Sequence, residues 1–129
     1  MKEKLSILLV EDNILNQRIV TFSLRKYHHE VTIANNGKEA LDLFKKSVFD
    51  VILMDIMMPV MDGLDATQHI REYEKSHDIE KITPIIALTA NTMDNDRQKC
   101  LSYGMNEFMA KPFDMERLNQ IFRELRIYE

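Results

Sequence analysis

Short apolar runs, separated by longer stretches with helical spacing, constrain the fold of this chain more than any other feature. Three of them are nearly continuous rather than alternating, and they cover residues 5–10, 51–54 and 85–88. Such runs are typical of strands buried on both faces of a parallel sheet. A fourth run at 108–110 is shorter, and residues 31–34 alternate as a less buried edge strand does. The chain is therefore predicted to contain five strands.

Apolar residues at helical spacing lie between these runs and predict helices that bury one face. The stripes consist of Leu15, Ile19 and Phe22; of Leu41, Phe44 and Val48; of Leu64, Thr67, Ile70 and Arg71; and of Met115, Leu118, Ile121, Phe122 and Leu125. Asp114 is the predicted N-cap of the last helix. Residues 93–101 offer little apolar surface, so a helix there would be weakly anchored.

The alternation of strands and helices predicts the fold class. Five β-α units with right-handed crossovers place helices on both faces of a five-stranded parallel sheet. We expect an α/β fold made of a single doubly wound (βα)5 domain, with half of a Rossmann fold as the nearest alternative. In either fold the functional crevice lies at the carboxyl ends of the strands.

Length and composition exclude several classes of protein. The 129 residues suffice for one domain, and 17 Lys and Arg against 21 Asp and Glu give a net charge of −4. This mild acidity argues against direct binding of nucleic acid or of anionic membranes. No apolar run approaches the roughly 20 residues that span a bilayer, and the first residues lack a signal-peptide core. Cys100 is the only cysteine, which excludes an internal disulfide and makes a cytoplasmic protein the default expectation.

Polar side chains follow four of the predicted strands. Glu11 and Asp12 come after the first strand, Asp55 after the third, Thr89 after the fourth and Lys111 after the fifth. Because the carboxyl ends of parallel strands meet at one edge of a sheet, these groups are predicted to converge. Three acids, one hydroxyl and one ammonium would then line one crevice.

This combination of groups indicates metal-assisted phosphoryl chemistry. Three carboxylates in one crevice repel one another unless a cation joins them. Oxygen ligands with no cysteine or histidine nearby favour Mg²⁺, or Mn²⁺ as a substitute. Adjacent His28 and His29 are interpreted as surface residues, because neighbouring side chains at a helix end diverge. Metal, Lys111 and Thr89 together would clamp a phosphoryl group in transfer, with Asp55 as a possible nucleophile.

Four motifs then carry a resemblance to a known family. They are ILLVEDN at 7–13, LMDIMMPVMDG at 53–63, ALTA at 87–90 and MAKPF at 109–113. In this order they resemble the response-regulator receiver domain of two-component signalling, and most closely the receivers of hybrid sensor histidine kinases. The resemblance extends from residue 5 to about residue 125. It implies the flavodoxin-like strand order 2-1-3-4-5 and a receiver domain over 1–129 with no output domain.

The resemblance also assigns roles to individual residues. It implies that Asp55 is the phosphoacceptor and that the Mg²⁺ ligands are Glu11, Asp12, Asp55 and the Met57 carbonyl. It also implies that Thr89 is the switch hydroxyl, Lys111 the phosphoryl-binding ammonium and Phe108 the switch aromatic. The implied partner is a sensor histidine kinase or a histidine phosphotransfer protein. Such a domain catalyses its own phosphorylation and dephosphorylation and is not a conventional enzyme. The kinase, the stimulus, the output and the oligomeric state stay open.

Two residues depart from the common pattern of the family. Glu11 stands where an aspartate is common, so it is predicted to reach the metal through water. Phe108 replaces a frequent tyrosine, so this position has no phenolic hydroxyl to form a hydrogen bond. The Lys111–Pro112 bond is expected to be cis, which only a bond before proline adopts at low cost.

Three other functions are weighed against this interpretation. A flavodoxin-like electron carrier needs a Ser-, Thr- or Gly-rich phosphate loop, whereas residues 11–16 would repel phosphate without a metal. A hydrolase of the haloacid-dehalogenase type needs a second aspartate two residues after its nucleophile, where this chain has Met57. A P-loop around Gly37 would need glycine at position 32 and Ser or Thr at 39, where Thr32 and Glu39 stand.

Overall fold

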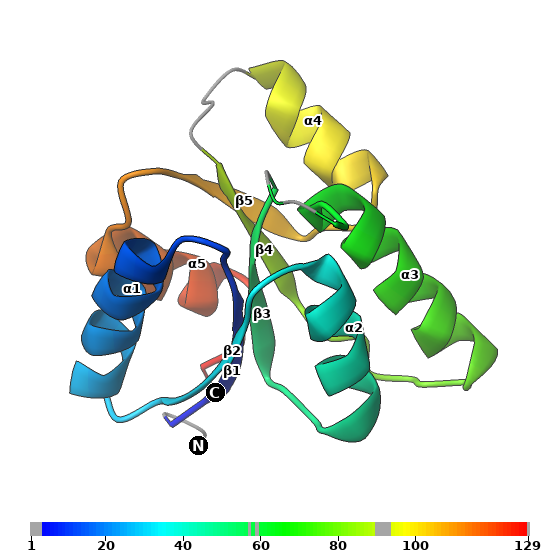
Figure 1. The fold of residues 1–129 in the computed structure, drawn as a ribbon, viewed down its shortest axis with the longest axis horizontal. Helices are drawn as coiled ribbons and strands as arrows, with labels where there is room; N and C mark the ends of the chain where they lie inside the picture. Colours follow the sequence, from blue (N-terminus) through cyan, green and yellow to red (C-terminus); the bar gives the residue numbers. More distant parts are fainter. Residues whose placement is uncertain (1–3, 57, 59, 90–93, 129) are drawn as a thin grey trace.

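The computed structural model of the protein describes residues 4–56, 58, 60–89 and 94–128. A parallel sheet lies between two layers of helices (Figure 1). Strands and helices alternate along the chain in the order β1 (Ser6–Val10), α1 (Ile14–Lys26), β2 (Glu30–Ala34), α2 (Gly37–Lys46), β3 (Val51–Asp55), α3 (Gly63–Ser76), β4 (Ile85–Thr89), α4 (Asp94–Ser102), β5 (Glu107–Ala110) and α5 (Met115–Glu124).

The five strands pair in the order β2-β1-β3-β4-β5, and every pairing is parallel. This order confirms the predicted doubly wound α/β fold and excludes half of a Rossmann fold. Strands β3 and β4 are buried along their whole length, as their continuous apolar runs predict. Strand β2 lies at the edge and is mostly exposed, in agreement with its alternating sequence.

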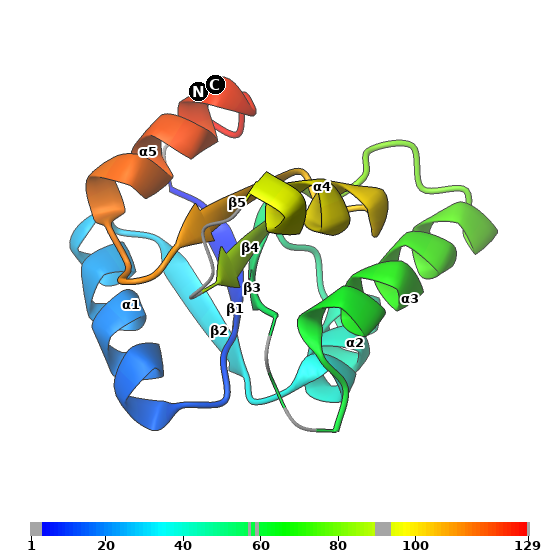
Figure 2. The same ribbon diagram turned by 90° about the horizontal axis from the view of Figure 1, so that it is seen from above.

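Side chains of β1 point alternately into two cores, one on each face of the sheet. Leu8 and Val10 pack with side chains from α2 and α3, whereas Ile7 and Leu9 pack with side chains from α1 and α5. Figure 2 shows the same division, with α1 and α5 on one side of the sheet and α2 and α3 on the other. No helix among the described residues is both long and apolar enough to cross a bilayer.

Helix α1 turns a different face to the core than the apolar stripe predicts. Its buried residues are Gln17, Val20, Thr21 and Leu24. The side-chain amide of Gln17 donates to the backbone carbonyl of Glu11 and to Asn35 Oδ1, so polar contacts help to set the rotation of the helix. The predicted core residues Leu15, Ile19 and Phe22 are instead exposed, with 66%, 49% and 64% of their surface accessible.

The prediction that both histidines of the pair lie at the surface is wrong for His29. His28 is exposed, but His29 is 4% exposed. Its Nδ1 accepts the backbone N–H of Leu5 at 3.0 Å, and its Nε2 lies 3.1 Å from the Tyr128 hydroxyl. That hydroxyl donates to Asn119 Oδ1 at 2.8 Å. His29 therefore joins the start of β1 to the segment after α5.

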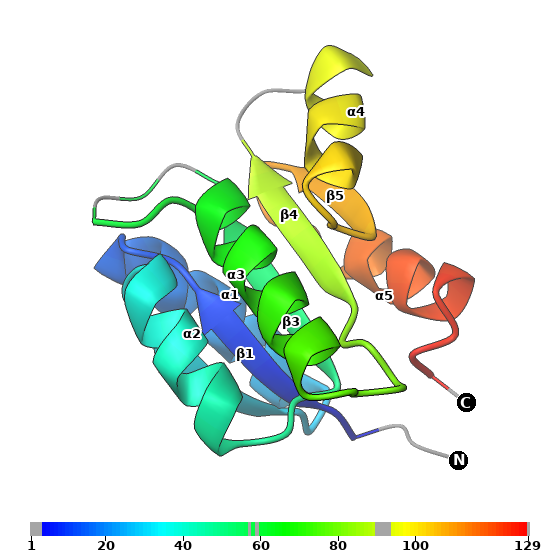
Figure 3. The same cartoon turned by 90° about the vertical axis from the view of Figure 1, so that its right-hand side faces the viewer.

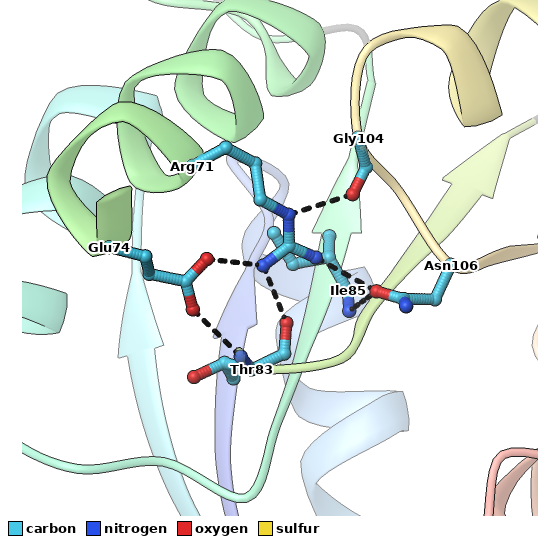
Figure 4. A network of polar contacts seen from close by, with 6 residues as sticks. All are labelled: Arg71, Glu74, Thr83, Ile85, Gly104 and Asn106. Atoms are coloured by element: carbon cyan, nitrogen blue, oxygen red, sulfur yellow. Dashed lines mark hydrogen bonds and ion pairs between the residues drawn. The ribbon is translucent and has the colours of Figure 1, made fainter. Parts of the chain in front are cut away.

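A polar network connects α3 with the segment before β4 and with the segment between α4 and β5 (Figure 4). Arg71 Nη1 lies 2.6 Å from the buried carboxylate of Glu74 and 2.9 Å from the Thr83 carbonyl that accepts its N–H. Arg71 Nε and Nη2 donate to the Gly104 carbonyl and to Asn106 Oδ1, each at 2.8 Å. The network satisfies a buried charge and holds the start of β5 beside α3.

Candidate functional site

The polar residues predicted to converge lie at one end of the sheet. Strands β1 and β4 run in the same direction in Figure 3, so their carboxyl ends reach the same edge. Asp55 is the last residue of β3 and Thr89 is the last residue of β4. Glu11 follows β1 directly, and Lys111 follows β5. The parallel topology therefore brings these side chains together, as the sequence predicts.

Three carboxylates form a cluster that could hold a metal ion. One oxygen from each of Glu11, Asp12 and Asp55 lies within 4.8 Å of the others. Glu11 and Asp55 are buried, with 2% and 3% of their surface exposed, whereas Asp12 is exposed. Glu11 Oε2 accepts the backbone N–H of Asn13 at 3.2 Å, which orients its side chain.

Lys111 completes the charge distribution of the cluster. Its ammonium nitrogen lies 3.4 Å from Asp55 Oδ2 and 3.4 Å from Glu11 Oε1. Its backbone N–H donates to the Thr89 carbonyl at 2.7 Å, which extends the β4–β5 pairing, and the Lys111–Pro112 bond is cis as expected. Three carboxylates and one ammonium leave a formal charge of −2, which one divalent cation would neutralise. The donor set, three carboxylates without sulfur or imidazole, is the kind that Mg²⁺ prefers.

Thr89 and Phe108 lie on neighbouring strands next to the cluster. Thr89 is 7% exposed and is paired in register with Ala110. Phe108 is half-buried, packs against the core that contains α2 and α3, and is paired with the small residue Ala87. Met57, the remaining predicted site residue, lies outside the described residues.

A match to a family model identifies the family of this chain. The model of the response regulator receiver domain matches residues 7–123, which is most of the chain. The chain belongs to the response-regulator receiver domain family. Its four predicted motifs all fall within the matched residues, and its observed strand order is that of the receivers of known structure.

Three relatives illustrate how similar this receiver is to known ones. Hybrid signal transduction histidine kinase K of Dictyostelium discoideum is 43% identical over 115 residues, which cover 87% of this chain and 10% of the kinase. The receiver domain of Ssk1 of Saccharomyces cerevisiae, solved in complex with the phosphotransfer protein Ypd1, superimposes with a TM-score of 0.90 at 33% identity. That match covers 96% of this chain and 90% of the Ssk1 receiver.

The third relative carries a metal ion. The receiver domain of the sensor histidine kinase PA1611 of Pseudomonas aeruginosa, with Mg²⁺ coordinated in its active-site cleft, is 41% identical with a TM-score of 0.81. The match covers 94% of this chain and 96% of that receiver. The hybrid kinase from Dictyostelium is much longer than this receiver, which spans only a tenth of its length.

Two residues of the site were not among the predicted ones. A Cβ atom added to Gly63 would clash with the backbone oxygen of Asp55, so only glycine lets the start of α3 approach β3 this closely. The motif at 53–63 contains this glycine, and its position eight residues after Asp55 is the sequence feature that could have identified it. Gln17, which holds the backbone carbonyl of Glu11, has no comparable sequence signal.

A small cavity opens beside the cluster. It has a volume of about 140 Å³, and its lining includes Glu11, Lys111, Phe113 and Ile19. Ile19 also belongs to the exposed apolar face of α1, so the apolar surface of that helix continues to the edge of the site. A partner that reaches Asp55 from this side of the receiver would therefore contact α1.

Proposed function

We propose that this receiver takes a phosphoryl group onto the Asp55 carboxylate from a phosphohistidine of a sensor histidine kinase or a histidine phosphotransfer protein. The observation that carries the proposal is the grouping of a buried Asp55 with two further carboxylates and Lys111 at the strand ends. The similarity to a hybrid histidine kinase and to a receiver solved with a phosphotransfer protein supports this choice of donor. We place the reaction in the cytoplasm.

The transfer exchanges one phosphorus bond for another. An oxygen of the Asp55 carboxylate attacks phosphorus, the P–N bond of the donor breaks, and its electron pair returns to the imidazole nitrogen. Water later attacks phosphorus, and the bond to the Asp55 oxygen breaks to release inorganic phosphate. The receiver thus catalyses its own phosphorylation and dephosphorylation and turns over no separate substrate. Lys111, at 3.4 Å from Asp55 Oδ2, would hold an oxygen of the transferred group.

The three clustered carboxylates, with the Met57 carbonyl as a further ligand, would hold Mg²⁺, or Mn²⁺ in its place. When bound, such a cation neutralises negative charge on a phosphoryl group in transfer. The exposed Asp12 is proposed as a direct ligand. Glu11 already contacts Lys111 and the Asn13 N–H, which supports a contact to the metal through water.

Thr89 and Phe108 are proposed to transmit the signal. A phosphoryl group adds about −1.5 to −2 charge and three strong acceptor oxygens at the end of β3. Thr89, at the end of the adjacent strand β4, would turn inward and donate its hydroxyl to one of these oxygens. The vacated space beside the small Ala87 could then take the Phe108 ring. This population shift would alter the surface formed by α4 and β5.

The exposed apolar face of α1 is proposed as the docking surface of the phosphodonor. Its four large side chains are at least 49% exposed, and they are Ile14, Leu15, Ile19 and Phe22. A partner must bring a phosphohistidine to Asp55, and this face continues into the apolar cavity lined by Glu11 and Lys111. Contiguous apolar surface of this kind marks a site of protein association.

Phosphorylation from a small donor tests the proposal most directly. The receiver is incubated with acetyl phosphate, with and without Mg²⁺, and its intact mass is measured. We expect one added phosphoryl group only with Mg²⁺, and none in Asp55→Asn. The matched control Asp42→Asn, an exposed aspartate of α2, should label like the wild type. Equal labelling of Asp55→Asn and wild type would overturn the assignment of the phosphoacceptor.

A further inference from the structure

We infer that a groove at the opposite end of the sheet from Asp55 binds an acidic peptide segment that carries one large apolar side chain. The groove, of about 260 Å³, lies between the end of α2 and the segment that connects α3 to β4. Phe49 at its base precedes the first residue of β3, whereas Asp55 is the last residue of that strand. Strand β3, whose five residues end at Asp55, extends over about 17 Å between the two sites. An occupant of the groove would leave Asp55 accessible to its phosphodonor.

The first argument is the charge of the groove. Of the described residues, those that line it include three lysines and no carboxylate, and the lysines are Lys45, Lys46 and Lys81. None of them takes part in an ion pair among the described residues, so a carboxylate of a partner would not have to displace one of this chain. Lys45 and Lys46 lie in the last turn of α2, where positive charge also complements the helix dipole. Lys81 lies outside any helix, so the dipole does not account for it.

The second argument is the apolar surface around these lysines. Val48 is 92% exposed, the highest value among the large apolar residues of the described chain, although its spacing predicts a buried position in α2. Ile79 and Ile82, which flank Lys81 in the sequence, are 38% and 51% exposed. Phe44 and Phe49, which are largely buried, form the base of the groove. An apolar base with an ammonium rim fits an apolar side chain flanked by carboxylates.

The arrangement around Tyr73 favours a peptide over a nucleotide. The Tyr73 ring stacks on His77 with centroids 4.0 Å apart, and Phe44 meets it edge-on at 5.9 Å. The Lys45 ammonium lies over the ring at 5.6 Å from its centroid. The Tyr73 ring is therefore already covered by His77, Phe44 and Lys45, which leaves it poorly placed to stack on a nucleobase. Lysines on two separate segments suit several carboxylates along a chain better than one compact phosphate.

A second docking site of this kind has a clear use in a receiver. A partner that holds the groove with an acidic segment keeps the receiver close to a phosphodonor without covering Asp55. Tethering of this kind raises the effective concentration of the donor without any new contact at the site of transfer. The inference does not depend on the phosphorylation of Asp55, because groove and phosphoacceptor lie at opposite ends of the sheet.

The test uses a short fluorescein-labelled peptide with one phenylalanine flanked by glutamates. Fluorescence anisotropy at low salt measures its binding to the 129-residue chain. We expect Lys81→Gln and Val48→Ser each to weaken binding about twofold to fivefold, as for the loss of one exposed contact. Added salt should weaken the binding of the peptide to the wild type, because it screens the attraction between glutamates and lysines. Lys38→Gln, at the exposed start of α2, is the matched control and should bind like the wild type.

Amide chemical shifts locate the bound peptide. Shifts confined to residues 45–49 and 79–83 would support the inference. Shifts centred on α1 or on Asp55, or equal binding by Lys81→Gln and Lys38→Gln, would overturn it. A peptide with lysines in place of the glutamates should not bind, and equal binding of that peptide would also refute the charge argument. If ATP bound the same groove more strongly than the acidic peptide does, the occupant would be a nucleotide and the inference of a peptide would be wrong.

Discussion

Acidification should weaken this fold through one buried side chain, His29. The backbone N–H of Leu5 can only donate, so Nδ1 of His29 must accept. The Tyr128 hydroxyl gives its proton to Asn119, so Nε2 must carry the ring proton and donate to Tyr128. The native contacts therefore need a neutral ring. A second proton on Nδ1 would face the Leu5 N–H and break this hydrogen bond.

Burial sets the sign of the effect. It lowers the pKa of His29 below 6.5, while the charge of Asp50 raises this pKa and that of His28 lowers it further. As the pH falls, the unfolded chain thus binds a proton on His29 before the folded chain does. The contribution of His29 to the free energy of unfolding is fully present above pH 6.5 and is lost as the pH falls from there toward the lower folded-state pKa. One proton limits the slope to about 1.4 kcal/mol per pH unit.

Urea unfolding at several pH values between about 7.5 and 5.5 measures this slope. His29→Asn is the informative variant, because its amide oxygen can accept the Leu5 N–H without titrating. We expect the free energy of unfolding of the wild type to fall more than that of His29→Asn across this range, by up to about 1.4 kcal/mol. His69→Gln, at an exposed position of α3 that does not act on His29, should keep the slope of the wild type. Equal slopes for the wild type and His29→Asn would refute the reasoning.

Three further predictions concern the proposed phosphoacceptor site. Gly63→Ala places a methyl group against the Asp55 backbone oxygen, so urea unfolding should show a loss of about 1–3 kcal/mol and acetyl phosphate should label the variant more slowly. Asp12→Ala should abolish Mg²⁺ binding in a titration, whereas Glu11→Ala should weaken it about 10–100-fold, as for a ligand that acts through water. Met57→Asn should shorten the lifetime of the phosphoryl group, because methionine cannot orient an attacking water by a hydrogen bond; an unchanged lifetime would contradict this.

Much of the fold and of the site could be predicted because the signals are local. Continuous apolar runs distinguish the buried strands β3 and β4 from the alternating edge strand β2. Once the strands are parallel, topology alone brings Asp55 to the same edge as Lys111 and Glu11. Asp114 caps α5 by accepting the Glu116 N–H at 3.0 Å, as its position before the apolar stripe predicts.

Contacts between residues far apart in the chain could not be predicted in this way. His29 is buried because Leu5, 24 residues before it, and Tyr128, 99 residues after it, supply its hydrogen bonds. Arg71, which pairs with the buried carboxylate of Glu74, is itself held by Gly104 and Asn106, which lie 33 and 35 residues further along the chain. A histidine or a glutamate carries no local mark of such partners, so the default expectation for each is a place at the surface.

The apolar residues that the stripes misplace have a different physical meaning. Helical spacing identifies an apolar face but does not say whether the core or a partner covers it. On α1 the core takes Val20 and Leu24, and the Gln17 amide sets the rotation of the helix, which leaves the stripe that includes Phe22 on the outside. Val48 is likewise left outside, beyond the end of α2. Single exposed apolar residues are common on protein surfaces, whereas apolar residues that adjoin one another there are typical of a site of association. The exposed stripe of α1 and the exposed Val48 lie on the two faces proposed to bind partners, one beside Asp55 and one at the opposite end of the sheet.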